Sequence, residues 1–163
     1  MEDPSGKLAA LKAQIEADQR VKSADDMEVG DIIYQNVDKN DGLTLKGSFA
    51  TRKKYFVIVG KNSKGDAIGL CFINSNLDFY KNNSAMQQYQ YLLKQKNYPA
   101  ILTKDSRLNC AELFTMNARK SIAVKAEVVG HLTEADEKAI FPLVASCAFI
   151  DAHLRKVYRI GEK

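Results

Sequence analysis

Two apolar runs around a short polar turn constrain the fold of this 163-residue chain more than any other feature. Residues 55–59 and 67–73 are rich in β-branched and aromatic side chains, which favour strands. The residues between them, 61–66, are polar and include Gly65, which is typical of a hairpin turn. The pattern predicts an antiparallel hairpin whose first strand is buried on both faces.

The rest of the chain predicts a mainly β, α+β fold, in which this hairpin belongs to a small barrel-like antiparallel sheet. Thr133, followed three residues later by Asp136, is a capping pair that predicts the start of a C-terminal helix. Pro142 lies inside this helix and is expected to kink it or divide it in two. The other expected elements are strands over 29–34, 107–116 and 122–129, a helix over 84–96 with Met86, Tyr89, Leu92 and Leu93 on one face, and a turn over 130–132.

Charge and composition divide the chain into an acidic helical arm (1–28), a body (29–150) and a basic tail (151–163). Good helix formers and a narrow apolar stripe predict a helix over 7–22 in the arm. Residues 1–29 hold seven acids and four bases, a net charge of −3. The remaining residues hold 20 bases and 13 acids, a net charge of +7. A basic body favours a polyanionic partner, and a solvated surface accounts for the charge equally well.

Several classes of protein are not supported by any motif. The chain has no P-loop, no dinucleotide-binding glycine pattern and no metal-binding pair of cysteines or histidines, so neither a cofactor nor a metal is expected. Cys71, Cys110 and Cys147 lie in apolar stretches, which predicts reduced, buried thiols. His131 is interpreted as a turn residue rather than a general base. No apolar run reaches the ~18 residues of a membrane span and no signal-peptide pattern is found, so a cytoplasmic protein without membrane contact is expected.

A basic segment, residues 51–54, lies immediately before the first strand of the hairpin. It contains Arg52, and the planar guanidinium group of arginine binds phosphate through two parallel hydrogen bonds. Asn74 and Ser75 end the second strand of the hairpin. Because the ends of paired strands are neighbours, these polar groups are expected to lie close to Arg52. The alternative interpretation is that the basic segment is only a solvated surface.

The order of these features resembles that of the PemK/MazF-like endoribonuclease toxins, a type II toxin–antitoxin family. The resemblance rests on the Gly-Asp-Ile-Ile-Tyr segment at 30–34, on Arg52 before an apolar strand, on the Asn-Ser pair at 74–75 and on the Gly-His-Leu-Thr segment at 130–133. It covers residues 29–150. It implies an SH3-like antiparallel barrel with a C-terminal helix, preceded in this chain by an extra N-terminal helix.

By this resemblance, the chain is expected to be a metal-independent, sequence-selective endoribonuclease. It would cleave single-stranded RNA by attack of a 2′-hydroxyl on the neighbouring phosphate. The resemblance places Arg52 on that phosphate, Ser75 at a position where the family has threonine or serine, and Glu112 one residue from the family's acid–base position. The implied partners are RNA, an antitoxin protein and a second copy of the chain. The implied RNA-binding residues are Lys46, Thr51, Lys53, Lys54 and Asn74.

The chain also departs from the family pattern. Lys53 follows Arg52 where the family has proline, residues 109–111 lack the family's arginine and aspartate, and the segment 78–96 is longer than in most members. Two other functions therefore stay open: a non-catalytic SH3-like module that binds nucleic acid or protein, and a structural subunit that docks through its N-terminal helix. A nuclease needs a second proton-transfer group near Arg52, which is the feature that separates these functions.

Overall fold

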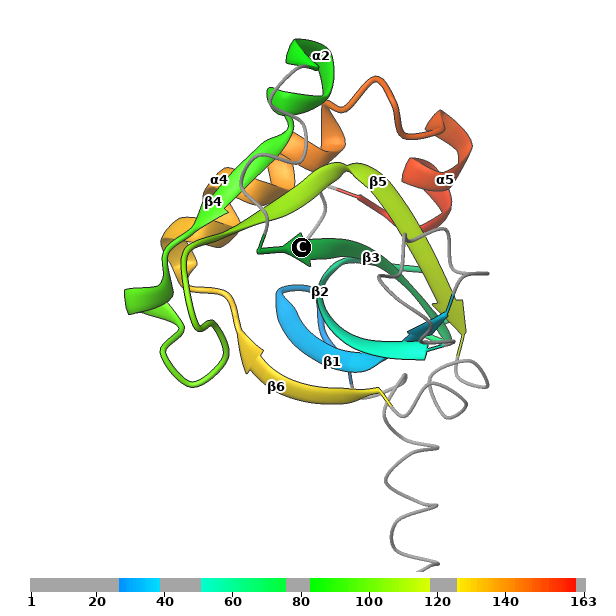
Figure 1. Cartoon of the computed structure of the whole chain (residues 1–163). Coiled ribbons are helices and arrows are strands. Elements are labelled where there is room, and N and C mark those ends of the chain that lie inside the picture. The colour runs from blue at the N-terminus through cyan, green and yellow to red at the C-terminus, as the bar shows by residue number, and fades with distance from the viewer. Residues whose placement is uncertain (1–26, 39–50, 76–82, 118–125, 161–163) are drawn as a thin grey trace, which may run out of the picture.

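The computed structural model describes residues 27–38, 51–75, 83–117 and 126–160 (Figure 1). For residues 37, 38 and 51–53 we describe the backbone alone. Residues 1–26 of the predicted acidic arm, with its helix over 7–22, lie outside the described residues, and so does Lys46. The described part of the chain forms one six-stranded sheet of order β4-β5-β3-β2-β1-β6, in which every pair of neighbours is antiparallel. The predicted mainly β, α+β fold is confirmed at this level.

The sheet has six strands and is strongly curved (Figure 1). Their bounds are β1 Asp31–Asp38, β2 Thr51–Lys61, β3 Ala67–Asn74, β4 Gln90–Leu93, β5 Ser106–Asn117 and β6 Glu127–His131. The helical elements are α2 Ser84–Gln87, the 3₁₀ helix η2 Gln95–Asn97, α4 Glu134–Ala145 and α5 Ala152–Val157.

The predicted hairpin lies at the centre of the sheet as β2 and β3. Phe56 lies opposite Phe72, and the strands meet at a turn in which the amide N–H of Gly65 donates to the carbonyl of Asn62. Gly65 has a φ of +76°, which glycine adopts without steric penalty. The apolar run of β2 is buried on both faces, as its composition predicts, because the sheet has a core on each side.

Alternating residues of β2 enter these two cores. Val57 and Val59 pack on the side that α4 covers, together with Ile140 and Val144 of that helix. Phe56 belongs to the other core, which includes residues of β1, β3 and β5 as well as Met27. Because side chains alternate along a strand, one run of five apolar residues supplies both layers.

Helix α4 begins as the sequence predicts, with the Thr133 side chain accepting a hydrogen bond from the amide N–H of Asp136. Pro142 does not divide the helix, because α4 continues to Ala145, which leaves a kink as the form of the prediction that stands. Proline removes the hydrogen bond to the carbonyl four residues earlier. That carbonyl belongs to Lys138, and both Lys138 and Pro142 are exposed, so solvent can supply the missing donor.

The predicted helix over 84–96 is also wrong beyond its first turn. Helix α2 ends at Gln87, and residues 90–93 form strand β4 at the edge of the sheet, paired with β5. Leu93 is fully buried and Tyr91 packs on the core, whereas Leu92 between them is exposed. Buried and exposed side chains therefore alternate with the period of two of a strand in this segment, and not with the period of a helix.

The predicted turn over 130–132 is replaced by the end of β6 and the entry into α4. Gly130 and His131 pair with Ile32 and Asp31 of β1, and the amide N–H of Leu132 donates to the carbonyl of Gly30. The predicted strand over 122–129 overlaps β6 from Glu127, and residues 122–125 lie outside the described part of the chain.

The segment after α4 returns to the sheet. Helix α5 is capped by Asp151, and the carbonyl of Tyr158 accepts a hydrogen bond from the amide N–H of Lys61 at the end of β2. Ile160 is buried in the core on the α4 side. This contact brings α5 against the β2–β3 turn.

Candidate functional site

The start of β2 and the end of β3 lie at one end of the sheet, as the hairpin predicts, and the start of β5 joins them. Asn74 lies opposite Arg107 of β5. Ser75 follows Asn74 and is exposed, and Asp105 lies just before β5. We call Lys54, Asn74, Ser75, Asp105 and Arg107 the sheet-end cluster. Three neighbouring strands thus bring cationic, amide, hydroxyl and carboxylate groups to one end of the sheet.

Lys54 is the member of the predicted basic segment whose side chain is described. It is half-buried, and its Nζ lies 5.5 Å from the centre of the Phe72 ring, a cation–π contact between β2 and β3. Gln35 of β1 lies opposite Lys54, and its buried Oε1 has no hydrogen-bond partner among the residues that the structure describes. The aromatic ring keeps the ammonium group of Lys54 at this end of the sheet.

The other predicted residues of the basic segment occupy the first positions of β2. Thr51, Arg52 and Lys53 lie opposite Asp38, Val37 and Asn36 of β1. Their backbone therefore runs along the end of the sheet that carries Asn74 and Ser75.

Glu112, in contrast, is not at the sheet end. Leu70 lies opposite Phe114, and Phe72 lies opposite Asn109. Residues 110–113 of β5 therefore lie opposite the single residue Cys71 of β3 and form a β-bulge. Glu112 lies within this bulge, five residues along β5 from Arg107. Its charge is one of the weaker causes, after burial, that raise the pKa of the Cys71 thiol.

The bulge is held by a buried side-chain amide. Oδ1 of Asn109 accepts hydrogen bonds from Nε2 of Gln90, at 2.7 Å, and from the backbone N–H of Ala111, at 3.1 Å. Asn109 is 5% exposed, so these bonds replace the water that its carbonyl oxygen loses. The position of Glu112 is therefore set by a local structure that alternation along a regular strand does not predict.

Asp105 and Arg107 are the members of the cluster that the sequence interpretation missed. Asp105 is exposed, and its Oδ1 accepts a hydrogen bond of 2.8 Å from the backbone N–H of Gln95. Arg107 is half-buried between Asn74 of β3 and Leu92 of β4 in the strand pairing. The signal in the sequence is an Asp-x-Arg segment at the start of a predicted strand, which becomes informative only once β5 is known to pair with β3.

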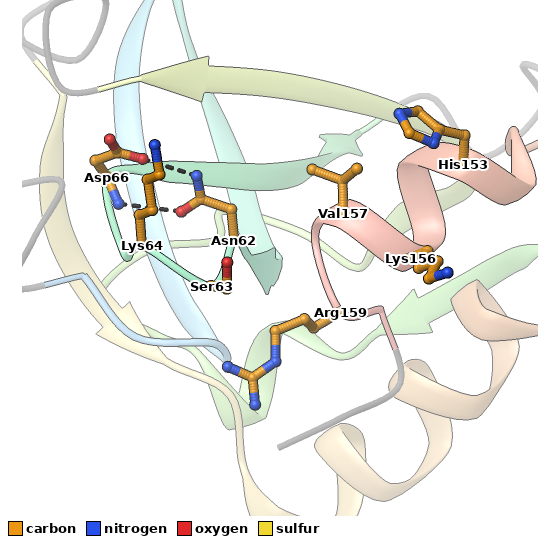
Figure 2. A pocket seen from close by; sticks show the side chains of 8 residues that line it. All are labelled: Asn62, Ser63, Lys64, Asp66, His153, Lys156, Val157 and Arg159. Atoms are coloured by element: carbon orange, nitrogen blue, oxygen red, sulfur yellow. Dashed lines mark hydrogen bonds between the residues drawn. The ribbon is translucent and has the colours of Figure 1, made fainter.

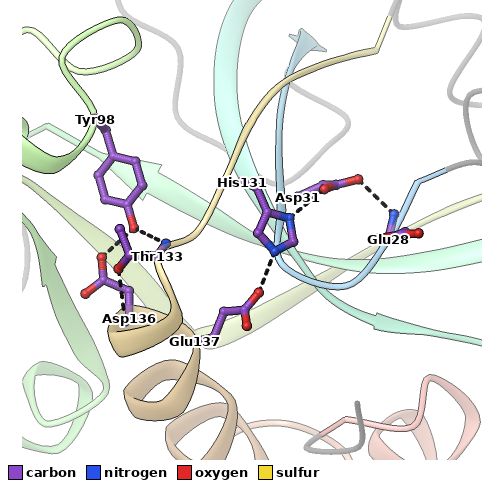
Figure 3. Close-up of polar contacts among 7 residues, drawn as sticks. All are labelled: Glu28, Asp31, Tyr98, His131, Thr133, Asp136 and Glu137. Atoms are coloured by element: carbon purple, nitrogen blue, oxygen red, sulfur yellow. Dashed lines mark hydrogen bonds and ion pairs between the residues drawn. The ribbon is translucent and has the colours of Figure 1, made fainter.

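A second polar cluster joins β1, β6 and α4 (Figure 3). Nδ1 of His131 lies 2.8 Å from Oδ1 of Asp31, and its Nε2 lies 2.6 Å from Oε1 of Glu137. Carboxylates only accept hydrogen bonds, so both ring nitrogens can donate only in the charged imidazolium form. The hydrogen bond to Asp31, with that to Glu137 and the charges of both, raises the pKa of His131 above 6.5, while partial burial opposes the shift.

A third cluster lies at the first turn of α4. Asp136 accepts hydrogen bonds from the hydroxyls of Tyr91, at 2.5 Å, and Tyr98. The Tyr98 oxygen in turn accepts from the backbone N–H of Thr133 at 3.0 Å (Figure 3). Burial, followed by the hydrogen bond to Asp136, raises the pKa of Tyr91 to about 12. All of these polar groups are occupied with one another.

The two clusters near α4 are therefore structural. A general base needs a nitrogen or oxygen that is open to the proton it removes, and both nitrogens of His131 already contact carboxylates. His131 is a residue of a strand rather than of a turn, and it ties β1, β6 and α4 together. In the sheet-end cluster, by contrast, Ser75 and Asp105 are exposed, and Lys54, Asn74 and Arg107 are partly buried.

The described residues have neither a metal-binding cluster nor a membrane-spanning helix. The described ranges contain no group of three or more His, Cys, Asp or Glu side chains placed to hold a metal ion. They also contain no helix that is long and apolar enough to cross a membrane. Cys71, Cys110 and Cys147 are free and buried, and burial raises the pKa of Cys71 and of Cys110. A protonated, buried thiol is a poor nucleophile.

Comparison with known proteins does not assign the chain to a family. No protein-family model matches it, and no curated protein matches its sequence.

Proposed function

We propose that this chain is a metal-independent endoribonuclease of the toxin type that cleaves single-stranded RNA at the sheet-end cluster. The proposal rests on the resemblance of the sequence to PemK/MazF-like toxins. The structural observation that supports it best is the pairing of Asn74 with Arg107, which brings an arginine of β5 to the end of the hairpin where β2 begins with Thr51 and Arg52. An SH3-like barrel, an antitoxin partner, a homodimer and a cytoplasmic location belong to the same proposal.

The chemistry needs few groups. The RNA 2′-oxygen loses its proton and bonds to the adjacent phosphorus, while the bond from phosphorus to the 5′-oxygen of the next nucleotide breaks. The leaving 5′-oxygen takes up a proton from solvent, so the products are a 2′,3′-cyclic phosphate and a 5′-hydroxyl. Negative charge grows on the phosphoryl oxygens in the transition state, and Arg52 and Arg107 offset it. Ser75 orients the 2′-hydroxyl or the phosphate by a hydrogen bond.

The step also requires a proton acceptor, and we assign it to Asp105 in place of Glu112. Asp105 is exposed and lies two residues from Arg107, and its hydrogen bond to the backbone of Gln95 uses Oδ1. This bond orients the carboxylate and does not involve its other oxygen, Oδ2. Glu112 lies five residues from Arg107 in the bulge of β5. An exposed carboxylate can act as a general base when the substrate is held within hydrogen-bond reach.

A second function is a non-catalytic module that binds RNA at the same cluster. The position of Glu112 favours it, because the acid that the family resemblance indicates lies away from the sheet end. The two functions share the phosphate-binding groups and differ only in the role of Asp105. They are separated by whether bound RNA is cut.

The test measures single-turnover cleavage of single-stranded RNA by three variants. Arg52→Ala should slow cleavage by ~10²-fold or more, since one preorganised donor contributes about 3 kcal/mol to the transition state. Asp105→Asn should also slow cleavage at saturating protein, with RNA affinity nearly unchanged. Glu112→Gln is the matched control, which should cut like the wild type.

Three outcomes would contradict the assignment. If Arg52→Ala cuts as fast as the wild type, the site lies elsewhere. If Glu112→Gln stops cleavage and Asp105→Asn does not, the proton acceptor is the residue that the family resemblance indicates. If the wild type binds RNA without cutting it, the binding module is the correct function.

A further inference from the structure

A pocket of about 550 Å³ lies between the β2–β3 turn and helix α5, away from the sheet-end cluster (Figure 2). Seven of its eight lining residues are polar or charged, and their charges decide which ligand the pocket suits. It is lined by Asn62, Ser63, Lys64 and Asp66 of the turn, and by His153, Lys156, Val157 and Arg159 of α5 and its C-terminal end.

The charge of this lining favours an anion. Lys64, Lys156 and Arg159 carry three positive charges against the single carboxylate of Asp66. Nδ2 of Asn62 donates a hydrogen bond of 2.7 Å to Oδ1 of Asp66, and Figure 2 shows Asp66 on the side of the turn that faces away from α5. Lys156 and Arg159 belong to the opposite wall, and in Figure 2 the side chain of Arg159 extends toward the turn whereas the amino group of Lys156 points away from it. An arginine with two lysines is a common phosphate-binding set.

Both walls of the pocket are fixed by hydrogen bonds. Oδ1 of Asn62 accepts from the backbone N–H groups of Asp66 and Ala67, each at 3.1 Å, which closes the turn. The walls are joined by the 2.9 Å bond from the amide N–H of Lys61 to the carbonyl of Tyr158. A ligand that binds here needs to order side chains but not the backbone, which lowers the entropic cost of binding.

Arg159 occupies a backbone position that normally selects glycine. Its φ is +54°, and the amide N–H groups of Arg159 and Ile160 donate to the carbonyls of Lys156 and Arg155. This pattern is the Schellman motif that ends a helix, with Arg159 at its left-handed position. An arginine at this position carries a backbone cost that glycine would avoid, and its side chain lines the pocket.

We propose that this pocket binds backbone phosphates of the same single-stranded RNA, as a second anchoring site. The identity of the ligand rests on the proposed function. The pocket lies at the turn of the hairpin, and the sheet-end cluster lies at its open end. Seven residues of β2 lie between Lys54 and Asn62, which corresponds to on the order of 25 Å along the strand. Because β2 is buried on both faces, an RNA that contacts both sites has to cross the surface of the molecule and must be long enough to span this separation.

The test compares RNA binding by the wild type and by a Lys156→Gln/Arg159→Gly double variant. Glycine suits the left-handed position, so the double variant should unfold at or above the temperature of the wild type. Lys96→Gln, an exposed lysine in η2, is the matched control. Fluorescence anisotropy is measured across a salt series with two labelled RNAs: a short one that fills only the sheet-end cluster, and a longer one that reaches both sites.

For the longer RNA, the double variant should bind on the order of tenfold more weakly. The slope of log K against log salt should fall by about 1.4, which corresponds to two lost phosphate contacts. The short RNA and the Lys96→Gln control should be unaffected. A longer RNA that the double variant binds as well as the wild type does would overturn the inference, and so would an equal loss in Lys96→Gln.

The outcomes also separate this inference from the proposed function. If the double variant loses affinity for the longer RNA but the wild type cuts none, the anchoring site stands and the nuclease proposal fails. If the wild type cuts RNA and the double variant binds it unchanged, the nuclease proposal stands and the anchoring site fails. A wild type that binds no RNA contradicts both, and leaves the basic pocket to a partner of another class.

Discussion

At the scale of single residues, the buried carboxylates at the start of α4 show how the chain compensates charge in its interior. Asp136 is 7% exposed and Glu137 is 5% exposed, and burying an unpaired carboxylate costs several kcal/mol. The hydroxyls of Tyr91 and Tyr98 donate hydrogen bonds to the carboxylate of Asp136, and the imidazole of His131 contacts the carboxylate of Glu137. These side chains therefore fix the orientation of α4 on the sheet rather than serve chemistry.

The contacts of His131 predict a pH-dependent contribution to stability. Its pKa in the folded protein is raised, so the stabilisation is fully present below the unfolded pKa of about 6.5 and is lost as the pH rises through the folded value. Urea unfolding of the wild type and of His131→Gln at a series of pH values should show the largest difference in unfolding free energy at the acidic end of that series.

The control for this experiment is His153→Gln, since His153 is exposed on α5. The unfolding free energy of His153→Gln should stay close to that of the wild type at every pH. The contrary outcome is a difference in unfolding free energy between the wild type and His131→Gln that stays constant or grows toward alkaline pH. Either result would show that His131 is not held as an imidazolium between Asp31 and Glu137.

The sequence predicted part of the sheet-end cluster. A hairpin brings the residues before its first strand next to those after its second, so the neighbourhood of Lys54 and Asn74 follows from the turn alone. The contribution of Asp105 and Arg107 depends on which strand pairs with β3, a long-range choice that local pattern does not encode. The position of Glu112 depends on the bulge that Asn109 stabilises.

At the scale of elements, strand β4 shows where periodicity misleads. Met86, Tyr89, Leu92 and Leu93 fit one face of a helix, yet only α2 is helical and β4 follows it. The segment has a free edge of β5 to pair with, and tertiary hydrogen bonds outweigh a weak local preference. The strands with continuous apolar runs, β2 and β3, were predicted correctly because no helix of that composition fits between polar turns.

The packing of α5 on the hairpin gives a stability prediction. Gly60 and Gly69 lie opposite each other, and a Cβ on Gly60 would lie 2.4 Å from the carbonyl oxygen of Tyr158. Gly60→Ala should therefore displace the end of α5 and destabilise the fold by about 1–3 kcal/mol. In thermal unfolding, this lowers the midpoint by roughly 2–4 °C for each kcal/mol in a chain of this size.

Gly69→Ala is the matched control for this packing. Its Cβ would meet a methyl group of Leu113 at 3.1 Å, which is the end of a flexible side chain rather than backbone. It should lower the unfolding midpoint less than Gly60→Ala does. Equal shifts for the two variants would show that α5 is not held tightly against β2.

At the scale of the whole molecule, the hairpin places two cationic sites at its two ends. The sheet-end cluster lies where β2 begins, and the α5 pocket lies where β2 turns into β3. The net charge of +7 over residues 30–163 is consistent with a polyanionic ligand that contacts both. The general class of the fold was predictable from strand composition, whereas the strand order that makes β5 a neighbour of β3 was not.

The most direct test of the account is the reaction of the whole chain with single-stranded RNA, in the presence and absence of EDTA, followed by analysis of the RNA ends. The account predicts cuts at preferred sequences, at the same rate with EDTA, that leave a 2′,3′-cyclic phosphate and a 5′-hydroxyl. Cleavage that EDTA abolishes, or products with a 5′-phosphate, would contradict attack by the 2′-hydroxyl at a metal-independent site.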